Sequence, residues 1–213
     1  MLEYISVNTQ NSIRIDTGCG VIYCDPFEID EVKQDAKLIC ITHPHFDHFS
    51  PESIAKIATG ETIFVCPACM TADVKALNIA DEKILGVVPG DQLTAADIPV
   101  TVVPAYNTKK PFHAKENNWV GYIITVNEQR IYIAGDTNFI PEQNEIDCGI
   151  AILPIGGYYT MDAREAAACV NAMAPKAVIP THYGTIVGHP TEGALFEKFV
   201  NDGIDVVFKL FVG

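Results

Sequence analysis

Half of this chain's histidines lie within one hexapeptide, and that clustering limits the folds open to it. Three of the six occur in the run His43-Pro44-His45-Phe46-Asp47-His48. With this composition, chance places His-x-His-x-Asp-His somewhere in the chain with a probability of about three in ten thousand. Imidazole nitrogens and a carboxylate oxygen are good ligands for Zn²⁺, Fe and Mn. The hexapeptide therefore predicts half of a site for two metal ions.

The segments on either side predict that the hexapeptide lies on a loop from a strand to a helix. The preceding run 37–42 is largely apolar and has the length of a buried strand. After the motif, Ser50 is a favourable N-cap, Pro51 suits the first helical position, and Glu52 complements the helix dipole. Side chains on such a loop are exposed and can converge on an ion.

The spacing within the hexapeptide divides its side chains between two ions. His43 and His45 can reach one metal, while Asp47 and His48 reach a neighbour about 3.5–4 Å away, the separation used by two-metal hydrolytic sites. The alternative is a loop of solvated histidines. It is disfavoured because crowded imidazoles are costly unless they bind something or stay neutral.

Two later segments carry residues that can complete such a site. The run 130–137, Arg-Ile-Tyr-Ile-Ala-Gly-Asp-Thr, has a strand pattern and contains Asp136, and the run 179–184, Ile-Pro-Thr-His-Tyr-Gly, contains His182. Together with the hexapeptide, with Asp25-Pro26-Phe27 and with the run 153–157, these segments resemble the metallo-β-lactamase superfamily. The resemblance covers residues 5–187. Within that superfamily, the pattern is most similar to the small metal-dependent hydrolases related to ascorbate-6-phosphate lactonase and N-acyl-phosphatidylethanolamine phospholipase D.

This resemblance implies an α+β fold, the four-layer αβ/βα sandwich, formed by a single domain over residues 1–213. It also implies that Asp136 bridges two ions and that His182 completes the second site. The superfamily usually supplies a third histidine to the first ion, but the expected place carries Asn107. Either His113, six residues further on, reaches back into the site, or fewer protein ligands hold the first ion.

The predicted function is metal-assisted hydrolysis by two divalent ions, with Zn favoured and Mn, Fe or Ni as alternatives. Asp47 and Asp136 are the predicted catalytic residues. The predicted metal ligands are His43, His45, Asp47, His48, His113, Asp136 and His182. The expected substrate is a small ester, lactone or phosphodiester. The rival functions are an iron-dependent oxidoreductase of the same fold and a non-catalytic metal-binding protein.

Two further segments carry hypotheses about the site. Asp25 ends an apolar strand and is a candidate hydrogen-bond partner for a metal-binding histidine, since such histidines usually donate their other N–H to a carboxylate or carbonyl. The glycine pair in 154–161 predicts a tight turn, with backbone N–H groups presented to a ligand as the alternative. The sixth histidine, His189, is predicted to lie in a surface turn.

Charge and composition restrict the partners. The net charge of −13 repels phosphate backbones and argues against nucleic acid. Lys109, Lys110 and Lys115 cluster beside the predicted site, either as solvated side chains or as a basic rim that attracts an anionic substrate. No run is apolar for long enough to span a membrane, and the N-terminus does not resemble a signal peptide.

The seven cysteines do not form a disulfide pattern, and five lie within or beside apolar segments. They indicate buried thiols of a reduced, cytoplasmic protein. The sequence leaves open whether the chain forms a homo-oligomer. Hydrophobic patterning predicts helices at 161–173, capped by Thr160, and from Glu192 to Val200. The strands predicted besides 37–42 are 3–8, 11–15, 20–24, 62–66, 84–88, 98–106, 118–126, 130–134, 149–153, 177–179 and 204–211.

Overall fold

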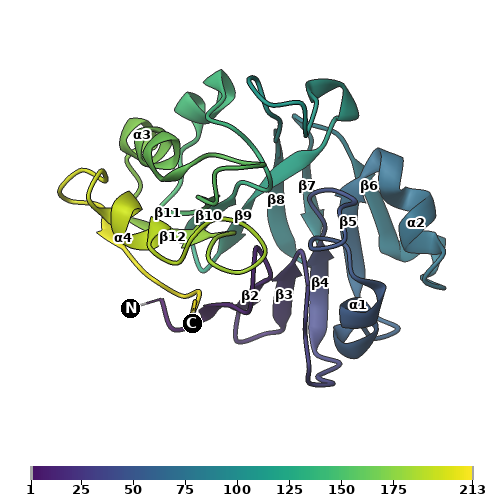
Figure 1. Ribbon diagram of the computed structural model, residues 1–213. Helices are drawn as coiled ribbons and strands as arrows, with labels where there is room; N and C mark the ends of the chain where they lie inside the picture. Colours follow the sequence, from purple (N-terminus) through teal and green to yellow (C-terminus); the bar gives the residue numbers. More distant parts are fainter. Residues whose placement is uncertain (1, 213) are drawn as a thin grey trace.

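The computed structural model describes residues 2–212, which form two β-sheets packed face to face with helices on their outer sides (Figure 1). The first sheet has the order β1-β2-β3-β4-β5-β6 and the second β13-β12-β11-β10-β9-β8-β7. The first comprises β1 (Ile5–Val7), β2 (Ile13–Asp16), β3 (Val21–Cys24), β4 (Ala36–Cys40), β5 (Ile63–Pro67) and β6 (Ile84–Val87). The second comprises β7 (Gln92–Ala95), β8 (Ile98–Pro104), β9 (Val120–Val126), β10 (Gln129–Ile133), β11 (Ile150–Pro154), β12 (Ala177–Thr181) and β13 (Asp205–Val206).

Both sheets pass from antiparallel to parallel pairing along the chain. Strands β1 to β3 pair antiparallel and β3 to β6 parallel, while β7 to β10 pair antiparallel and β10 to β13 parallel. Strands β9 and β10 form a hairpin, whose two turn residues, Asn127 and Glu128, have φ angles of 49° and 64°. Positive φ at both central residues is the geometry of a type I′ turn, which matches the twist of the strands.

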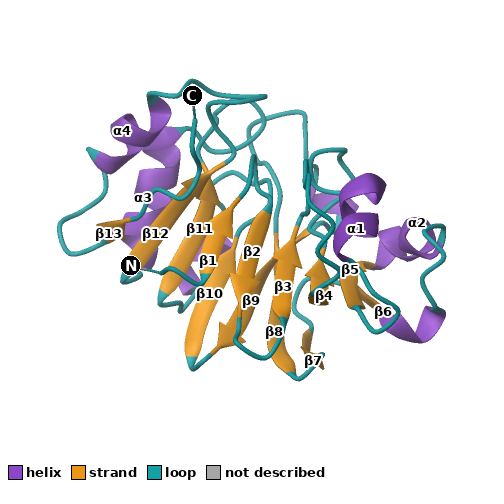
Figure 2. Ribbon diagram, turned by 90° about the horizontal axis from the view of Figure 1, so that it is seen from below, coloured by secondary structure: helices purple, strands orange, loops and turns teal. Residues whose placement is uncertain are grey.

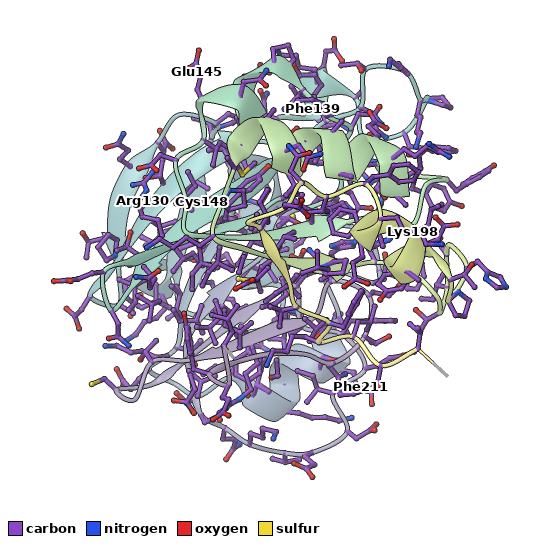
Figure 3. All side chains as sticks on the ribbon, turned by 90° about the vertical axis from the view of Figure 1, so that its left-hand side faces the viewer. Arg130, Phe139, Glu145, Cys148, Lys198 and Phe211 are labelled. Atoms are coloured by element: carbon purple, nitrogen blue, oxygen red, sulfur yellow. The ribbon has the colours of Figure 1, made fainter. Side chains whose placement is uncertain are left out.

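Helices cover the outer faces of the two sheets (Figure 2). The α-helices are α1 (Pro51–Ile57), α2 (Thr71–Lys75), α3 (Ala163–Met173) and α4 (Glu192–Glu197), with short 3₁₀ helices at Ala68–Met70, Asp81–Lys83, Lys115–Asn117 and Pro141–Glu145. Helices α1 and α2 lie outside the first sheet, and α3 and α4 lie outside the second. Figure 3 shows the molecule from the side of α3 and α4. The predicted N-cap of α1 is confirmed, because the Ser50 hydroxyl accepts a hydrogen bond from the Ser53 amide.

Apolar side chains fill the space between the sheets. Ile13 and Leu38 from the first sheet and Ile131 and Ile152 from the second are fully buried in one continuous cluster. A smaller cluster lies under α1 and α2, where Ile54 is buried against the first sheet. The layers of helix, sheet, sheet and helix confirm the predicted sandwich.

Several predicted element boundaries were wrong, most clearly in the C-terminal part of the chain. Helix α3 begins at Ala163, since the Asp162 carboxylate caps it by accepting from two backbone amides. The Thr160 hydroxyl donates instead to the carbonyl of Met161. The last strand is confined to Asp205–Val206, at the edge of the second sheet, and the second predicted helix ends at Glu197.

Candidate metal centre

All seven predicted ligand side chains meet where loops leave the two sheets. They form two groups, in each of which the candidate ligand atoms lie within 4.8 Å of one another. The first group is His43, His45, His113 and Asp136, and the second is Asp47, His48 and His182. Six of the seven are buried, and His45 is the member that opens toward solvent.

Asp136 is the side chain that both groups share. Its Oδ2 lies 3.2 Å from Nε2 of His113 and 3.9 Å from Nε2 of His43, in the first group. Its Oδ1 lies 3.3 Å from Nε2 of His48 and 3.5 Å from Nε2 of His182, in the second group. The two carboxylate oxygens therefore face different groups, which is the arrangement that a bridging ligand requires.

The loops that carry these side chains all follow strands. Residues 43–48 follow β4, Asp136 follows β10, His182 follows β12 directly, and His113 lies on the loop after β8. The carboxyl ends of neighbouring parallel strands meet at one edge of a sheet, so residues distant in sequence converge there. The His113 loop is closed by a hydrogen bond of 2.8 Å from the Asn107 amide to the His113 carbonyl, which turns the imidazole back toward the site.

Three residues of this region adopt the left-handed conformation that usually favours glycine. The φ angles are 48° at Asp25, 56° at His113 and 58° at His182. Such backbone costs of order 1–3 kcal/mol per residue and tends to cluster at functional sites. At these positions it aims the side chains at a common point, at the expense of local stability.

His113, rather than Asn107, joins the first group. The Asn107 side-chain amide donates to the Tyr159 carbonyl over 2.7 Å and lies 3.3 Å from Nδ1 of His113. The loop that carries His113 thus reaches back into the site. This was one of the two predicted alternatives. Coordination of a metal by His113 stays a prediction.

The electrostatics of the two groups keep His43 neutral and Asp136 ionised, and they hold an extra proton on His48. Burial opposes a charge on His48, but the carboxylates of Asp136, Asp25 and Asp47 outweigh it and raise the pKa of this imidazole to about 9. Burial, reinforced by the neighbouring His48, lowers the pKa of His43 well below its usual value. Burial would raise the pKa of Asp136, but the surrounding imidazoles lower it far more, so this carboxylate is ionised.

The donor atoms fit divalent ions. Within the described residues, Nε2 of His113 and Oδ1 of Asp136 are buried without a hydrogen-bond partner. Ring nitrogens also face each other, with 3.0 Å between Nε2 of His43 and Nδ1 of His45 and 3.2 Å between Nε2 of His48 and Nε2 of His182. Buried polar atoms are costly when unpaired, and mixed imidazole and carboxylate donors suit Zn, Mn and Fe.

Comparison with known proteins agrees with this geometry. Residues 4–182 match the family model described as the β-lactamase superfamily domain. The chain belongs to the metallo-β-lactamase superfamily. It is 31% identical over 205 residues to a UPF0173 metal-dependent hydrolase of Thermococcus kodakarensis, with 89% of each chain covered. It is 30% identical to the UPF0173 metal-dependent hydrolase of Pyrococcus abyssi, with 82% of this chain and 78% of that one covered.

A crystal structure from Parabacteroides distasonis, titled as a metal-dependent hydrolase, is similar throughout. Its TM-score is 0.81 at 29% identity, with 97% of this chain and 93% of that chain covered. These findings confirm a metal-dependent hydrolase of the metallo-β-lactamase superfamily. In addition, none of the helices formed by residues 2–212 has the length and apolarity to cross a membrane.

Asp25 holds the second group of this metallo-β-lactamase site in place. Its Oδ2 is 2.7 Å from Nδ1 of His48 and accepts from the Thr42 hydroxyl at 2.7 Å and the Asn11 amide at 3.1 Å. Its Oδ1 accepts from the Thr42 backbone amide at 2.8 Å. Asn11 in turn accepts from the Thr181 hydroxyl, next to His182. The expected contact of Asp25 with a site histidine is confirmed, and it turns Nε2 of His48 toward the ligands.

The glycine pair forms a closely packed turn beside His182. A Cβ on Gly156 would lie 2.1 Å from the His182 carbonyl oxygen, and Gly157 has a φ of 84°. The amides of Gly157 and Tyr158 donate within this turn, to the carbonyls of Met161 and Gly156. The predicted tight turn is confirmed, and the amides of Gly157 and Tyr158 are paired within it. His189 is exposed and bonds Thr191, as predicted for a surface turn.

Trp119 is a site residue that the sequence patterns did not identify. Its ring centroid lies 5.0 Å from that of His43, 5.1 Å from that of His45 and 5.4 Å from that of His113. The indole therefore flanks three histidines of the first group. It is the only tryptophan of the chain, so its fluorescence reports on this group alone.

We expect metal binding to the metal-free protein to release a proton from His48. Because the pKa of this imidazole is raised to about 9, it holds a proton below that pH and must lose it to coordinate an ion. Affinity for Zn²⁺ should rise by about tenfold per pH unit up to about pH 9 and then level off. Calorimetry in buffers of different ionisation enthalpy measures the released protons. Binding near neutral pH without proton release would contradict this assignment.

Proposed function

We propose that this protein is a dinuclear hydrolase, with Zn²⁺ as its preferred ion, acting on a small ester, lactone or phosphodiester. The observation that carries the proposal is the position of Asp136, whose two oxygens face two separate groups of buried ligands. A site for a single ion would leave one group of buried imidazoles without a partner, at a cost that native structures generally avoid.

The seven side chains would divide between two ions. The first ion would be held by His43, His45 and His113, and the second by Asp47, His48 and His182. Asp136 would contact both ions. When bound, such ions lower the pKa of a water molecule and polarise a carbonyl or phosphoryl oxygen. Asp47 lines the pocket, and its pKa is lowered because the imidazoles of His182 and His48 outweigh the effect of burial. Its ionised carboxylate is placed to accept a hydrogen bond from water and orient it.

The proposal is tested by metal reconstitution followed by a substrate screen. Protein stripped with a chelator and reloaded with Zn²⁺, Mn²⁺ or Fe²⁺ is assayed on aryl esters, lactones, thioesters and phosphodiesters. We expect two ions per chain and hydrolysis that depends on them. Metal-free protein with equal activity, or fully loaded protein that cleaves none of these classes, would contradict the proposal. A redox reaction that requires iron would support the oxidoreductase alternative instead.

Replacing His113 with alanine should weaken metal binding at the first group by about tenfold to a hundredfold or more. Even the loss of a residue that only hydrogen-bonds to a metal ligand has an effect of about this size. Because Trp119 flanks that group, paramagnetic Ni²⁺ should quench its fluorescence at a higher concentration in His113→Ala than in the unaltered protein. The matched control is His189→Ala, which removes an exposed histidine outside both groups. Identical titrations for His113→Ala and the control would exclude the ligand role.

A further inference from the structure

The pocket beside the two ligand groups has one polar wall and one apolar wall. Its volume is about 280 Å³, at the lower end for small-molecule sites. The polar wall comes from the ligand groups and comprises His45, Asp47, Asp136 and His182. The apolar wall comprises Phe46, Phe112, Tyr159, Ile186 and Val187. A substrate whose reacting bond lies at the ligands must therefore place its remaining atoms against apolar side chains.

Two of the three nearby lysines are engaged in contacts outside this pocket. Lys110 donates to the backbone carbonyls of Gly157 and Thr160, which ties its loop to the turn before α3. Lys115 pairs with Glu142 at 3.0 Å and bonds the Tyr106 hydroxyl. Of the described residues that line the pocket, none is a lysine or an arginine. Two of the three lysines thus fasten a loop, and an anionic group in the pocket would meet no cationic side chain among the described lining residues.

The apolar wall is partly open to solvent. Phe46 is 66% exposed and Ile186 is 50% exposed, although large apolar side chains are normally covered. Phe46 is held by edge contact with Phe27, at a centroid distance of 5.8 Å, and Phe112 by edge contact with Tyr159, at 4.8 Å. Exposed apolar surface that adjoins a polar, concave site is typical of a surface that a ligand covers.

We propose that the substrate carries an uncharged, apolar acyl or aryl group next to the bond that is cleaved. That group would cover Phe112 and Ile186 while the reacting carbonyl or phosphoryl group lies at the ligands. This inference rests on the proposed hydrolase function and deepens it, because it selects among the substrate classes. Specificity would come from Phe46, Phe112, Tyr159, Ile186 and Val187.

The test uses hydroxamates on protein loaded with Zn²⁺, since the metal-binding end stays constant while the tail varies. The probes are acetohydroxamate, butanohydroxamate, hexanohydroxamate and the monohydroxamate of succinic acid. Each buried CH₂ should tighten binding by about fourfold, and hexanohydroxamate has about four more CH₂ groups than acetohydroxamate. Burial of only about two of them should tighten its binding by at least about tenfold. The anionic succinic tail should give no gain. Dissociation constants are measured by calorimetry, with Trp119 fluorescence as a second readout.

Variants locate the source of the gain. Ile186→Ala should reduce the advantage of the hexanoyl tail severalfold, and Phe112→Ala should do the same from the opposite loop. Ile186 is half exposed, so its replacement leaves the fold intact even where a change at Phe112 disturbs the His113 loop. The matched control is Phe211→Ala, since Phe211 is 91% exposed near the end of the chain and outside the pocket (Figure 3).

The outcomes separate this inference from the hydrolase function. Acetohydroxamate that binds with no further gain from longer tails would overturn the apolar specificity and leave the metal site standing. Tighter binding of the succinic tail, or a gain that survives both Ile186→Ala and Phe112→Ala, would also overturn it. If acetohydroxamate does not bind to protein that holds Zn²⁺, the proposed function fails, and this inference fails with it.

Discussion

Replacing Asp136 with alanine will remove at least one of the two ions and lower kcat/KM by about 10³-fold or more. One oxygen of this carboxylate faces the first ligand group and the other faces the second, so its loss weakens both. Metal ions contribute several kcal/mol of charge stabilisation to hydrolysis, and each 1.36 kcal/mol is about tenfold in rate. Metal content by plasma mass spectrometry and steady-state kinetics on the best substrate of the screen measure the two effects.

Two companion variants define what the Asp136 result means. Asp136→Asn keeps the shape but removes the negative charge, so it should retain more metal than Asp136→Ala and still lose most of the activity. Asp202→Ala removes an exposed aspartate outside both ligand groups and should change neither quantity. Asp136→Ala protein that still holds two ions and keeps normal kcat/KM would rule out a bridging carboxylate.

Replacing Asp25 with alanine will destabilise the metal-free protein by about 3–5 kcal/mol, the range for breaking a buried charged pair. The change leaves the Thr42 amide, the Thr42 hydroxyl, the Asn11 amide and Nδ1 of His48 without their buried acceptor. For a chain of this size the midpoint of thermal unfolding should fall by roughly 6–20 °C. Affinity of the second group for Zn²⁺ should also fall by about tenfold to a hundredfold, because His48 loses its orientation.

The asparagine variant separates the two consequences of losing Asp25. Asp25→Asn keeps an oxygen acceptor and the side-chain volume, so much of the thermal stability should return. With its nitrogen in the place of Oδ2, the amide cannot accept a hydrogen bond from Nδ1 of His48, so the imidazole is not held in the tautomer that frees Nε2 for a metal. We therefore expect the zinc affinity of Asp25→Asn to stay low. Recovery of both stability and affinity would mean that Asp25 acts only as a packed acceptor.

The sequence patterns predicted the parts of the site that depend on short spacing. Residues 43–48 sit on one loop, and Asp136 and His182 follow strands with strong apolar periodicity, so their positions are set by local structure. The N-cap of α1 was predictable for the same reason, because Ser50, Pro51 and Glu52 act within one turn. The mixed sheets themselves needed the family resemblance, since periodicity does not fix strand order.

The remaining parts depend on contacts between segments that are far apart in the chain. The path of the 107–118 loop is set by bonds from Asn107 and Lys110 to the turn at 157–160, about fifty residues later. No local pattern encodes such a pairing, so the sequence allows both alternatives for the place of His113. Trp119 resembled a half-buried strand residue, and only the converging loops place it beside three histidines.

The role of the lysine cluster illustrates the same limit. In the sequence, three cationic side chains beside a metal motif are consistent with a basic rim around an anionic substrate. In the fold, the carbonyls at 157 and 160 surround Lys110, Glu142 pairs with Lys115, and only Lys109 of the three is exposed to solvent without a side-chain partner among the described residues. Charge density along a chain predicts a binding surface only when the side chains stay free, and the fold decides that.

Anomalous X-ray scattering from crystals loaded with Zn²⁺ tests the central claim most directly, because it locates each ion independently of the protein model. We expect two peaks about 3.5–4 Å apart, with Asp136 between them. Nε2 of His113 should lie about 2.0–2.1 Å from the ion of the first group. A single peak at full occupancy, or two peaks that Asp136 does not link, would contradict a dinuclear centre.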